Sequence, residues 1–569
     1  MTHHREWPRG RRALLLVVVA LAGCAVAPAG GPPAPLPRTV KLVAFNDFHG
    51  NLQTPQGGVA DRDPADPAKR IVVPAGGVAY LATLVQERKT QNRDTIVVAA
   101  GDLIGASPLV SSLFRDEPTI EAMNLVGLDY TSVGNHEFDR GKAELLRMQN
   151  GGCSPTEGCF TPAGFAGATF RYLAANVIDT STGRPLFPPY AIRRLDDGVA
   201  IAFVGIVLKG TPSLVRPSGV AGLAFLDEAE TVNALVPELH AAGVDAIVLL
   251  IHQGAFTTGL YDDHRCPGVV GAILAIVPRL DPAIRLVVSG HTHQAYVCEI
   301  DGRTVTSAGF YGRLVTDIDM TIDRSAHAPT AIVAHNVIVD PRRLTPAPAV
   351  AELVARYDAL AAPRSARAAG SITTDIFYNM PNAAGETTMG DVIADAQLDA
   401  TSAADAGRAQ IAFTNPGGMR ASLAFHAPDG AVSYGDLFSV QPFGNSLVTM
   451  TLSGDELRLL LEQQWLPPQD EHGRVLQPSR GFAYSWDRTQ PVGSRVVPGS
   501  MRLHGVPIDP AAPYRVTVND FLAEGTSYAV LARGRDRQGG AQDIDALVAY
   551  FAAHSPVAPG RRDRINRTK

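Results

Sequence analysis

The chain has 569 residues, of which 46% are hydrophobic and 19% are charged. A chain of this length is too long for one hydrophobic core, and its composition is that of an ordinary soluble globular protein, so we expect at least two domains. The net charge of −6 gives no electrostatic reason to expect a nucleic-acid polymer as a partner. The function must therefore be sought in the sequence motifs.

The N-terminus has the features of an export signal. Several arginines precede an apolar segment from Ala13 to Ala22 that is too short to span a bilayer. The segment ends in Leu-Ala-Gly before Cys24, which resembles the bacterial lipobox. We therefore predict a signal peptide over residues 1–24, lipidation of Cys24 and a tether over residues 25–37, with an ordinary signal peptide that contains a cysteine as the alternative. The protein would then be exported to the periplasm or cell surface, with an outer-membrane lipid anchor as its only membrane attachment.

Export would permit disulfides between the cysteines that follow Cys24, which are Cys153, Cys159, Cys266 and Cys298. Three pairings are possible. Cys153 and Cys159 bracket a short polar loop, which favours their pairing with each other and leaves Cys266 to pair with Cys298. Zinc binding is the alternative, although neither pair has close Cys-x-x-Cys spacing.

From Arg38 onward, short apolar segments are repeatedly followed by polar residues that could bind a metal. Apolar segments of this kind predict strands buried on both faces, and the helical segments between them favour a layered α/β sheet with its ligand site at the carboxyl ends of the strands. The candidate ligands at five such strand ends are Asp47, His49, Asp102, Asn135, His252, His291 and His293. This set is too large for one tetrahedral ion and suits two ions that share a carboxylate.

The segment from Gly134 to Asp139 adds groups that could act in acid–base chemistry. Asn135 could offer a neutral oxygen to a cation, His136 could donate a proton to a departing group, and Asp139 could fix the imidazole tautomer. A polar helix start is the alternative, because asparagine before His-Glu caps helices well.

In this order, the motifs Asp-x-His, Gly-Asp, Gly-Asn-His-Glu, His and Gly-His-x-His resemble the calcineurin-like metallophosphoesterase family over about residues 38–340. The resemblance implies a four-layer β-sandwich flanked by helices and two divalent ions, with Zn, Mn, Co and Fe as candidates. One ion would be held by Asp47, His49, Asp102 and His293. The other would be held by Asp102, Asn135, His252 and His291.

The same resemblance assigns roles around the metals. Asp102 would bridge the two ions, and His136, oriented by Asp139, would stabilise the transition state or protonate the leaving oxygen. Asn176 matches a family asparagine near the phosphate, and a strand-end hydrogen bond is the alternative for this residue.

A helix from Ala349 to Ala362 is predicted by apolar residues spaced three and four apart, with prolines at both ends. We take residues 341–363 as a bridge to a second, smaller α/β domain over residues 364–556, followed by a tail over residues 557–569.

Four stretches of this second domain resemble the C-terminal domain of 5'-nucleotidases. They begin at Glu386, Asn415, Gln441 and Tyr514. The resemblance implies that two aromatic rings clamp a nucleobase and that an arginine meets the phosphate. The implied substrate contacts are Asn415, Arg420, Phe443, Asn445 and Phe521.

Two positions depart from the family pattern. Gly385 stands where an arginine is usual, and Ser527 stands where a carboxylate is expected to hold the ribose hydroxyls. Both departures concern the substrate and leave the metal ligands complete. We predict a two-metal hydrolase of nucleoside 5'-monophosphates. Its partner would be this small-molecule nucleotide substrate, and the protein is expected to be a monomer. Hydrolysis of nucleotide sugars, 2',3'-cyclic nucleotides or thiosulfate esters is the alternative, as is a surface binding protein without turnover.

Overall fold

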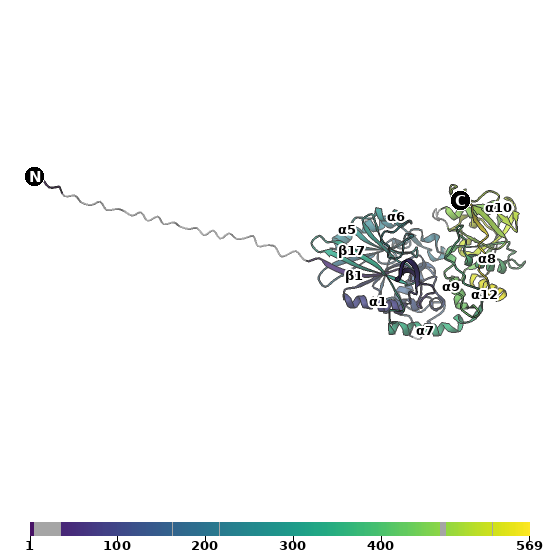
Figure 1. Cartoon of the computed structure of the whole chain (residues 1–569), viewed down its shortest axis with the longest axis horizontal. Coiled ribbons are helices and arrows are strands. Elements are labelled where there is room, and N and C mark those ends of the chain that lie inside the picture. Colours follow the sequence, from purple (N-terminus) through teal and green to yellow (C-terminus); the bar gives the residue numbers. More distant parts are fainter. Residues whose placement is uncertain (5–35, 162, 216, 467–473, 526) are drawn as a thin grey trace. The chain divides into compact units, whose positions relative to one another are not determined.

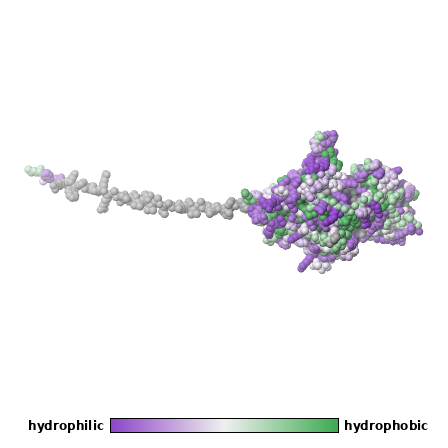
Figure 2. All heavy atoms as spheres, turned by 90° about the horizontal axis from the view of Figure 1, so that it is seen from below, coloured by the Kyte–Doolittle hydropathy of each residue, from purple (hydrophilic) through white to green (hydrophobic). Residues whose placement is uncertain are grey.

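The computed structural model describes residues 1–4, 36–161, 163–215, 217–466, 474–525 and 527–569. The predicted lipidation site Cys24 and nearly all of the predicted signal peptide and tether lie outside the described residues. Residues 37–569 form one unit (Figure 1). Among the described residues, none of the helices combines the length and apolarity needed to cross a membrane. The face of this unit seen in Figure 2 intersperses hydrophilic and hydrophobic side chains, as is ordinary for a water-exposed surface.

Two six-stranded mixed sheets form the amino-terminal part of this unit. The first sheet has the order β17 (Ala328–Ile338), β16 (Leu314–Asp323), β1 (Arg38–Phe45), β4 (Ile96–Ala100), β5 (Tyr130–Ser132) and β6 (Arg171–Leu173). The second has the order β14 (Ala295–Ile300), β15 (Arg303–Ala308), β13 (Ile284–Ser289), β12 (Ala246–His252), β10 (Ala200–Val207) and β9 (Tyr190–Arg194). The pairs β1–β4, β4–β5, β10–β12 and β12–β13 are parallel, which aligns their carboxyl ends.

The two sheets pack face to face and are covered by helices on their outer faces. Along β1, Leu42 points into the core between the sheets, whereas its neighbour Val43 points into the core under the helices, as the two-residue period of a strand requires. Residues of α1 (Val78–Gln91), α3 (Glu117–Val126) and α7 (Pro348–Ser365) cover the first sheet, and those of α5 (Glu228–Ala241) and α6 (Ile273–Ile276) cover the second. The predicted four-layer arrangement is confirmed.

Helix α7 differs in detail from the predicted helix over Ala349 to Ala362. It begins at Pro348 and continues through Pro363 to Ser365. Leu360, which the apolar spacing placed on the buried face, is 51% exposed, while Tyr357 is fully buried. The helix contacts both α3 and α9 (Tyr434–Val440). It therefore touches elements before and after itself in the chain.

The carboxyl-terminal part is built around a five-stranded sheet. Its order is β22 (Gln477–Pro478), β19 (Ile411–Thr414), β26 (Pro513–Asn519), β21 (Ser446–Ser453) and β27 (Arg535–Gln542). The helices around it include α8 (Thr388–Thr401), α10 (Gly454–Glu462) and α12 (Asp543–His554). Helix α8 begins after Thr387, whose side chain accepts a hydrogen bond from the backbone N–H of Gly390.

The segment that we predicted as a tail is part of the folded unit. Residues Ile565–Arg567 form strand β28, which pairs in parallel with β23 (Phe482–Trp486). The structure also pairs Cys153 with Cys159 and Cys266 with Cys298, the combination that the loop length favoured. Both partners of the second pair are buried in the core of the second sheet.

Candidate metal centre and active site

The candidate ligands lie at the carboxyl ends of the central parallel strands. Asp47 and His49 follow β1, Asp102 follows β4 and His252 ends β12. Candidate ligands form two overlapping groups of three residues. Within each group, one oxygen or nitrogen atom of each side chain lies within 4.8 Å of those of the other two. The groups are Asp47, His49 and His293, and Asp47, Asp102 and His252.

Most of these residues have an unusual backbone conformation. Their φ angles are positive, a region that costs a residue with a side chain about 1–2 kcal/mol. The residues and their φ angles are Asp47 (50°), His49 (48°), Asp102 (51°), His291 (73°) and His293 (55°). Such a concentration of strained residues at one place is typical of a functional site, where the positions of the side chains matter more than local stability.

Backbone carbonyls fix the orientation of two of the histidines. His49 Nδ1 lies 2.9 Å from the oxygen of Gly105, and His252 Nδ1 lies 2.7 Å from the oxygen of Ala100. Because a carbonyl only accepts hydrogen bonds, each Nδ1 carries the proton and each Nε2 presents a lone pair to the cluster.

These lone pairs face other acceptors. His252 Nε2 lies 3.0 Å from Asp102 Oδ2, yet it has no hydrogen-bond partner among the described residues. His49 Nε2 lies 3.1 Å from His293 Nε2 and 3.5 Å from Asp102 Oδ2. Buried acceptors held this close repel one another unless a positive charge lies between them. The donor set therefore fits divalent cations.

The electrostatics of the histidines agree with this interpretation. Burial lowers the pKa of His49 well below its usual value, and burial has the same effect on the pKa of His291. Burial would also lower the pKa of His252, but the carboxylate of Asp102 raises it to about 10. Asp102 therefore draws a positive charge onto His252, and a bound cation could replace that proton.

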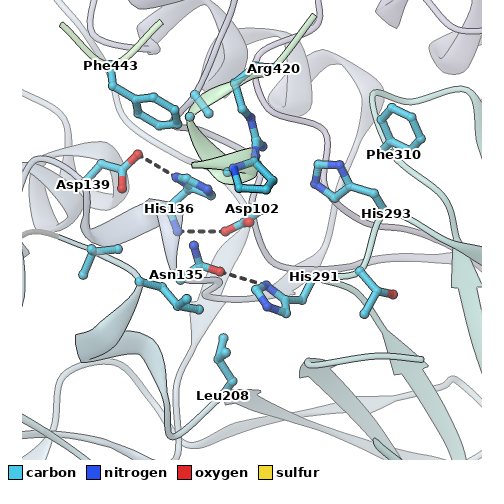
Figure 3. Close-up of a pocket in the computed structure, with 18 of the residues that line it drawn as sticks. Asp102, Asn135, His136, Asp139, Leu208, His291, His293, Phe310, Arg420 and Phe443 are labelled. Atoms are coloured by element: carbon cyan, nitrogen blue, oxygen red, sulfur yellow. Dashed lines mark hydrogen bonds and ion pairs between the residues drawn. The ribbon is translucent and has the colours of Figure 1, made fainter. Parts of the chain in front are cut away.

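The remaining candidate ligands extend the cluster on one side. His291 Nδ1 lies 3.1 Å from Asn135 Oδ1, and both residues line the same cavity as Asp102 (Figure 3). The structure thus brings together all the predicted ligands. The residue common to the two groups is Asp47, whereas the resemblance implied Asp102 as the bridge. Asp102 Oδ2 nevertheless lies 3.5 Å from His49 Nε2 in the other group.

His136 and Asp139 form the predicted pair. His136 Nδ1 lies 2.8 Å from Asp139 Oδ2, and the backbone N–H of His136 donates to Asp102 Oδ1 at 2.9 Å (Figure 3). Burial would lower the pKa of His136, but Asp139 and Asp102 raise it. Residues His136–Phe138 form a short 3-10 helix, to which the side chain of Asn135 makes no capping hydrogen bond. The helix-start alternative therefore does not explain Asn135.

Glu137 is a residue whose role sequence reasoning missed. Its buried carboxylate accepts hydrogen bonds from the backbone N–H groups of Asp102 at 2.9 Å, Leu103 at 2.8 Å and Gly134 at 2.5 Å. Burial, together with the charge of Asp102, raises the pKa of Glu137 to about 7. Glu137 thus ties the loop after β4 to the loop after β5. The only sequence signal was its place in the motif.

A cavity of about 1530 Å³ opens over the cluster and is lined by both parts of the unit. Arg420 Nη2 lies 3.3 Å from His49 Nε2, and the Phe443 ring is stacked with His136 at 5.7 Å between ring centroids (Figure 3). The predicted substrate contacts that line this cavity are Asn415, Arg420, Phe443, Asn445 and Phe521, and Ser527 lies there too.

Asn176 is not placed as the family resemblance implied. It is fully buried and is absent from the described residues that line the cavity. Its amide donates to the oxygens of Val207 and Leu226, and its oxygen accepts from the N–H of Val207. The side chain therefore serves the strand-end hydrogen bonds that we named as the alternative, and the substrate role is corrected.

The fold is α/β, and its Asp/His cluster has ligand atoms that could hold metal ions. Comparison with known proteins agrees. Residues 40–295 match the family described as calcineurin-like phosphoesterase, and residues 368–533 match the family described as 5'-nucleotidase, C-terminal domain. The chain therefore belongs to the calcineurin-like phosphoesterase family and carries a 5'-nucleotidase C-terminal domain.

Individual relatives match this chain over most of its length. The chain is 32% identical to the endonuclease YhcR of Bacillus subtilis over 92% of its own length, but it spans only 41% of that protein. It is 25% identical to a 5'-nucleotidase of Vibrio cholerae, with 96% of both chains covered. The solved structure of a 5'-nucleotidase precursor from Thermus thermophilus matches with a TM-score of 0.75 and 27% identity, covering 93% of this chain and 99% of that one.

Proposed function

We propose that this chain is a two-metal phosphohydrolase that releases phosphate from nucleoside 5'-monophosphates. The observation that carries the proposal is the meeting of two sets of groups in one cavity. The Asp/His/Asn cluster and His136 come from the amino-terminal part, and Arg420 and Phe443 come from the carboxyl-terminal part. A phosphate at the cluster would lie beside a guanidinium, and the aromatic rings would remain for a base.

The residues divide into holders of metal and groups that act on the ester. Asp47, His49, Asp102 and His293 would hold one ion, and Asp102, Asn135, His252 and His291 the other. Two such ions supply a positive centre that polarises a phosphoester and lowers the pKa of a water. His136 donates its Nδ1 proton to Asp139, which leaves Nε2 as the atom that can protonate the leaving oxygen. Its raised pKa favours the protonated form that this task needs.

The carboxyl-terminal part would select the substrate. Phe443 and Phe521 would hold the nucleobase between their faces, and Arg420 would contact the phosphate. Asn415 and Asn445 would add polar contacts, and Asn445 is itself positioned by donating to Asp543 Oδ2 at 3.1 Å.

A panel of phosphate esters tests the proposal. We expect the metal-loaded protein to release phosphate from AMP and other nucleoside 5'-monophosphates faster than it cleaves UDP-glucose, 2',3'-cyclic AMP or a thiosulfate ester. Preference for one of the last three would show that the substitutions at Gly385 and Ser527 mark a different substrate class. Binding of AMP without cleavage of any ester would indicate a binding protein instead.

Ser527 should weaken discrimination between ribose and deoxyribose. A serine hydroxyl makes neutral hydrogen bonds, whereas a carboxylate makes charge-assisted bonds worth about 1.5–3 kcal/mol. We therefore expect kcat/KM values for AMP and dAMP within about tenfold of each other, and a larger AMP preference in Ser527→Asp. Steady-state kinetics with both nucleotides would measure this ratio. Ser527→Ala is the matched comparison and should show an AMP preference no larger than that of wild type, because it loses the hydroxyl. A several-hundredfold AMP preference in wild type would show that another residue holds the ribose.

We also propose export and an outer-membrane lipid anchor at Cys24, on the basis of the apolar N-terminal segment and its lipobox-like end. Labelled fatty acid should enter the wild-type protein and not Cys24→Ala. A wild-type protein that takes up no label and is cleaved at another site would exclude the anchor.

A further inference from the structure

A second pocket, of about 340 Å³, lies beside the main cavity in the carboxyl-terminal part. The two share Tyr378, Pro416 and Arg474 in their walls, so they are neighbours. Four arginines line the second pocket, and no aspartate or glutamate does so among the described residues. The arginines are Arg474, Arg488, Arg495 and Arg567.

Two of these arginines carry positive charge that no carboxylate compensates. Arg474 and Arg488 are exposed, and neither has a carboxylate oxygen within 4.0 Å in the described part of the chain. Arg567 is also exposed, but its Nε donates to an oxygen of the terminal residue Lys569 at 3.0 Å. The nearby Arg564 shows the contrast, because both of its terminal nitrogens lie 2.8 Å from the carboxylate of Asp395. Unpaired guanidinium groups gathered in a concave site attract an anion.

The pocket is held in shape by buried groups. The fully buried carboxylate of Glu386 accepts hydrogen bonds from the backbone N–H groups of Arg564 at 3.0 Å and Ile565 at 3.2 Å. These bonds fix β28, on which Arg567 pairs with Trp486 and lies over its ring at 5.6 Å. The protein thus pre-positions Arg567.

A second tryptophan in the wall is also relevant. Arg495 lies 5.5 Å from the centre of the Trp465 ring. The indole nitrogen of Trp465 is buried without a hydrogen-bond partner among the described residues, although such a nitrogen normally finds one. The wall therefore combines two aromatic rings with the arginines.

Gly385, where the family pattern has an arginine, lies in the wall of this pocket rather than in the main cavity. Its φ is +90°, and a Cβ there would lie 2.8 Å from Val475 Cγ2. A larger side chain would therefore need Val475 to move. Arg474, the residue next to Val475, lines both pockets.

We propose that this second pocket binds a phosphate group. The planar guanidinium of arginine forms paired hydrogen bonds with phosphate oxygens, and Arg474 and Arg488 offer such groups with no aspartate or glutamate among the described residues in the wall of the pocket. The group could be inorganic phosphate or a second phosphate of a nucleotide whose cleaved phosphate lies at the metal cluster. Only the second source rests on the proposed function.

Calorimetric titration of the metal-loaded protein with inorganic phosphate tests the site. We compare wild type with Arg488→Met/Arg567→Met and with Arg561→Met, an exposed arginine of the same C-terminal segment that does not line the pocket. Wild type and Arg561→Met should bind phosphate at two places, the metal cluster and the pocket. The double variant should bind it at one and keep AMP turnover within about twofold. If the double variant does not fold, Arg488→Met alone should weaken the second site at least tenfold.

Kinetics with adenosine 3',5'-bisphosphate and ADP separate the two sources. If the pocket holds a second phosphate of the substrate, kcat/KM for one of these nucleotides should fall at least tenfold in the double variant, with little change for AMP. If it holds free phosphate, only the calorimetric site is lost. Equal phosphate binding in all variants would overturn the proposal. That result is distinguishable from failure of the proposed function, which would appear as absent AMP turnover in wild type.

Discussion

Asp102→Ala is expected to lose bound metal and to reduce phosphate release from AMP to the background rate. Asp102 Oδ2 lies 3.0 Å from His252 Nε2 and 3.5 Å from His49 Nε2, so its removal takes away the negative ligand that the two proposed ions would share. The carboxylate of Asp47 and the neutral histidines that remain carry a single negative charge, which is too little to hold two divalent ions close together. Metal content per chain and initial rate, measured on the same preparation, would check this.

Asp245→Ala provides the matched control for Asp102→Ala. Asp245 is also a buried aspartate, directly before β12, and its carboxylate accepts a hydrogen bond from the backbone N–H of Ala200 at 2.7 Å; it is not among the described residues that line the cavity. The control should lose some thermal stability and keep its metal. A variant of Asp102 with full metal content and full activity would refute the shared-ligand role.

His136→Ala is expected to keep its metal and to lose about 10² to 10⁴ in rate, the usual contribution of a positioned acid or base. Its Nδ1 is bonded to Asp139, and the substitution retains the backbone N–H that donates to Asp102. Asp139→Asn should cause a smaller loss, because the imidazole would remain without its orienting carboxylate. Metal analysis and single-turnover rates would separate binding from chemistry.

His264 is exposed, and His264→Ala serves as the control. This variant should match wild type in metal content and in single-turnover rate. Loss of metal in His136→Ala to the level of the Asp102 variant would make His136 a structural residue. An unchanged rate would remove it from the chemistry altogether.

The arrangement of the metal cluster could be predicted because its pattern is local. Each ligand follows a continuous apolar segment, and parallel strands bring their carboxyl ends to one edge, so Asp47, Asp102 and His252 had to lie near one another. The four layers follow from the same segments and the helices between them.

Other features depend on contacts that the sequence does not display. Glu137 acts through backbone N–H groups of residues more than thirty positions away in the chain, which no side-chain pattern records. An asparagine can contact a phosphate, so the residue type of Asn176 was compatible with that role. Its side chain is fully buried, however, and therefore serves the strand-end hydrogen bonds instead. Strand β28 lacks the apolar alternation of a typical strand, so its pairing with β23 and the second pocket remained hidden.

The most direct test of the account is a titration of metal-free protein with one divalent ion, such as Mn²⁺ or Zn²⁺, while bound metal and phosphate release from AMP are measured together. The account predicts no release without metal, and full turnover only as occupancy reaches two ions per chain. Turnover by metal-free protein, or full turnover at one ion per chain, would contradict it.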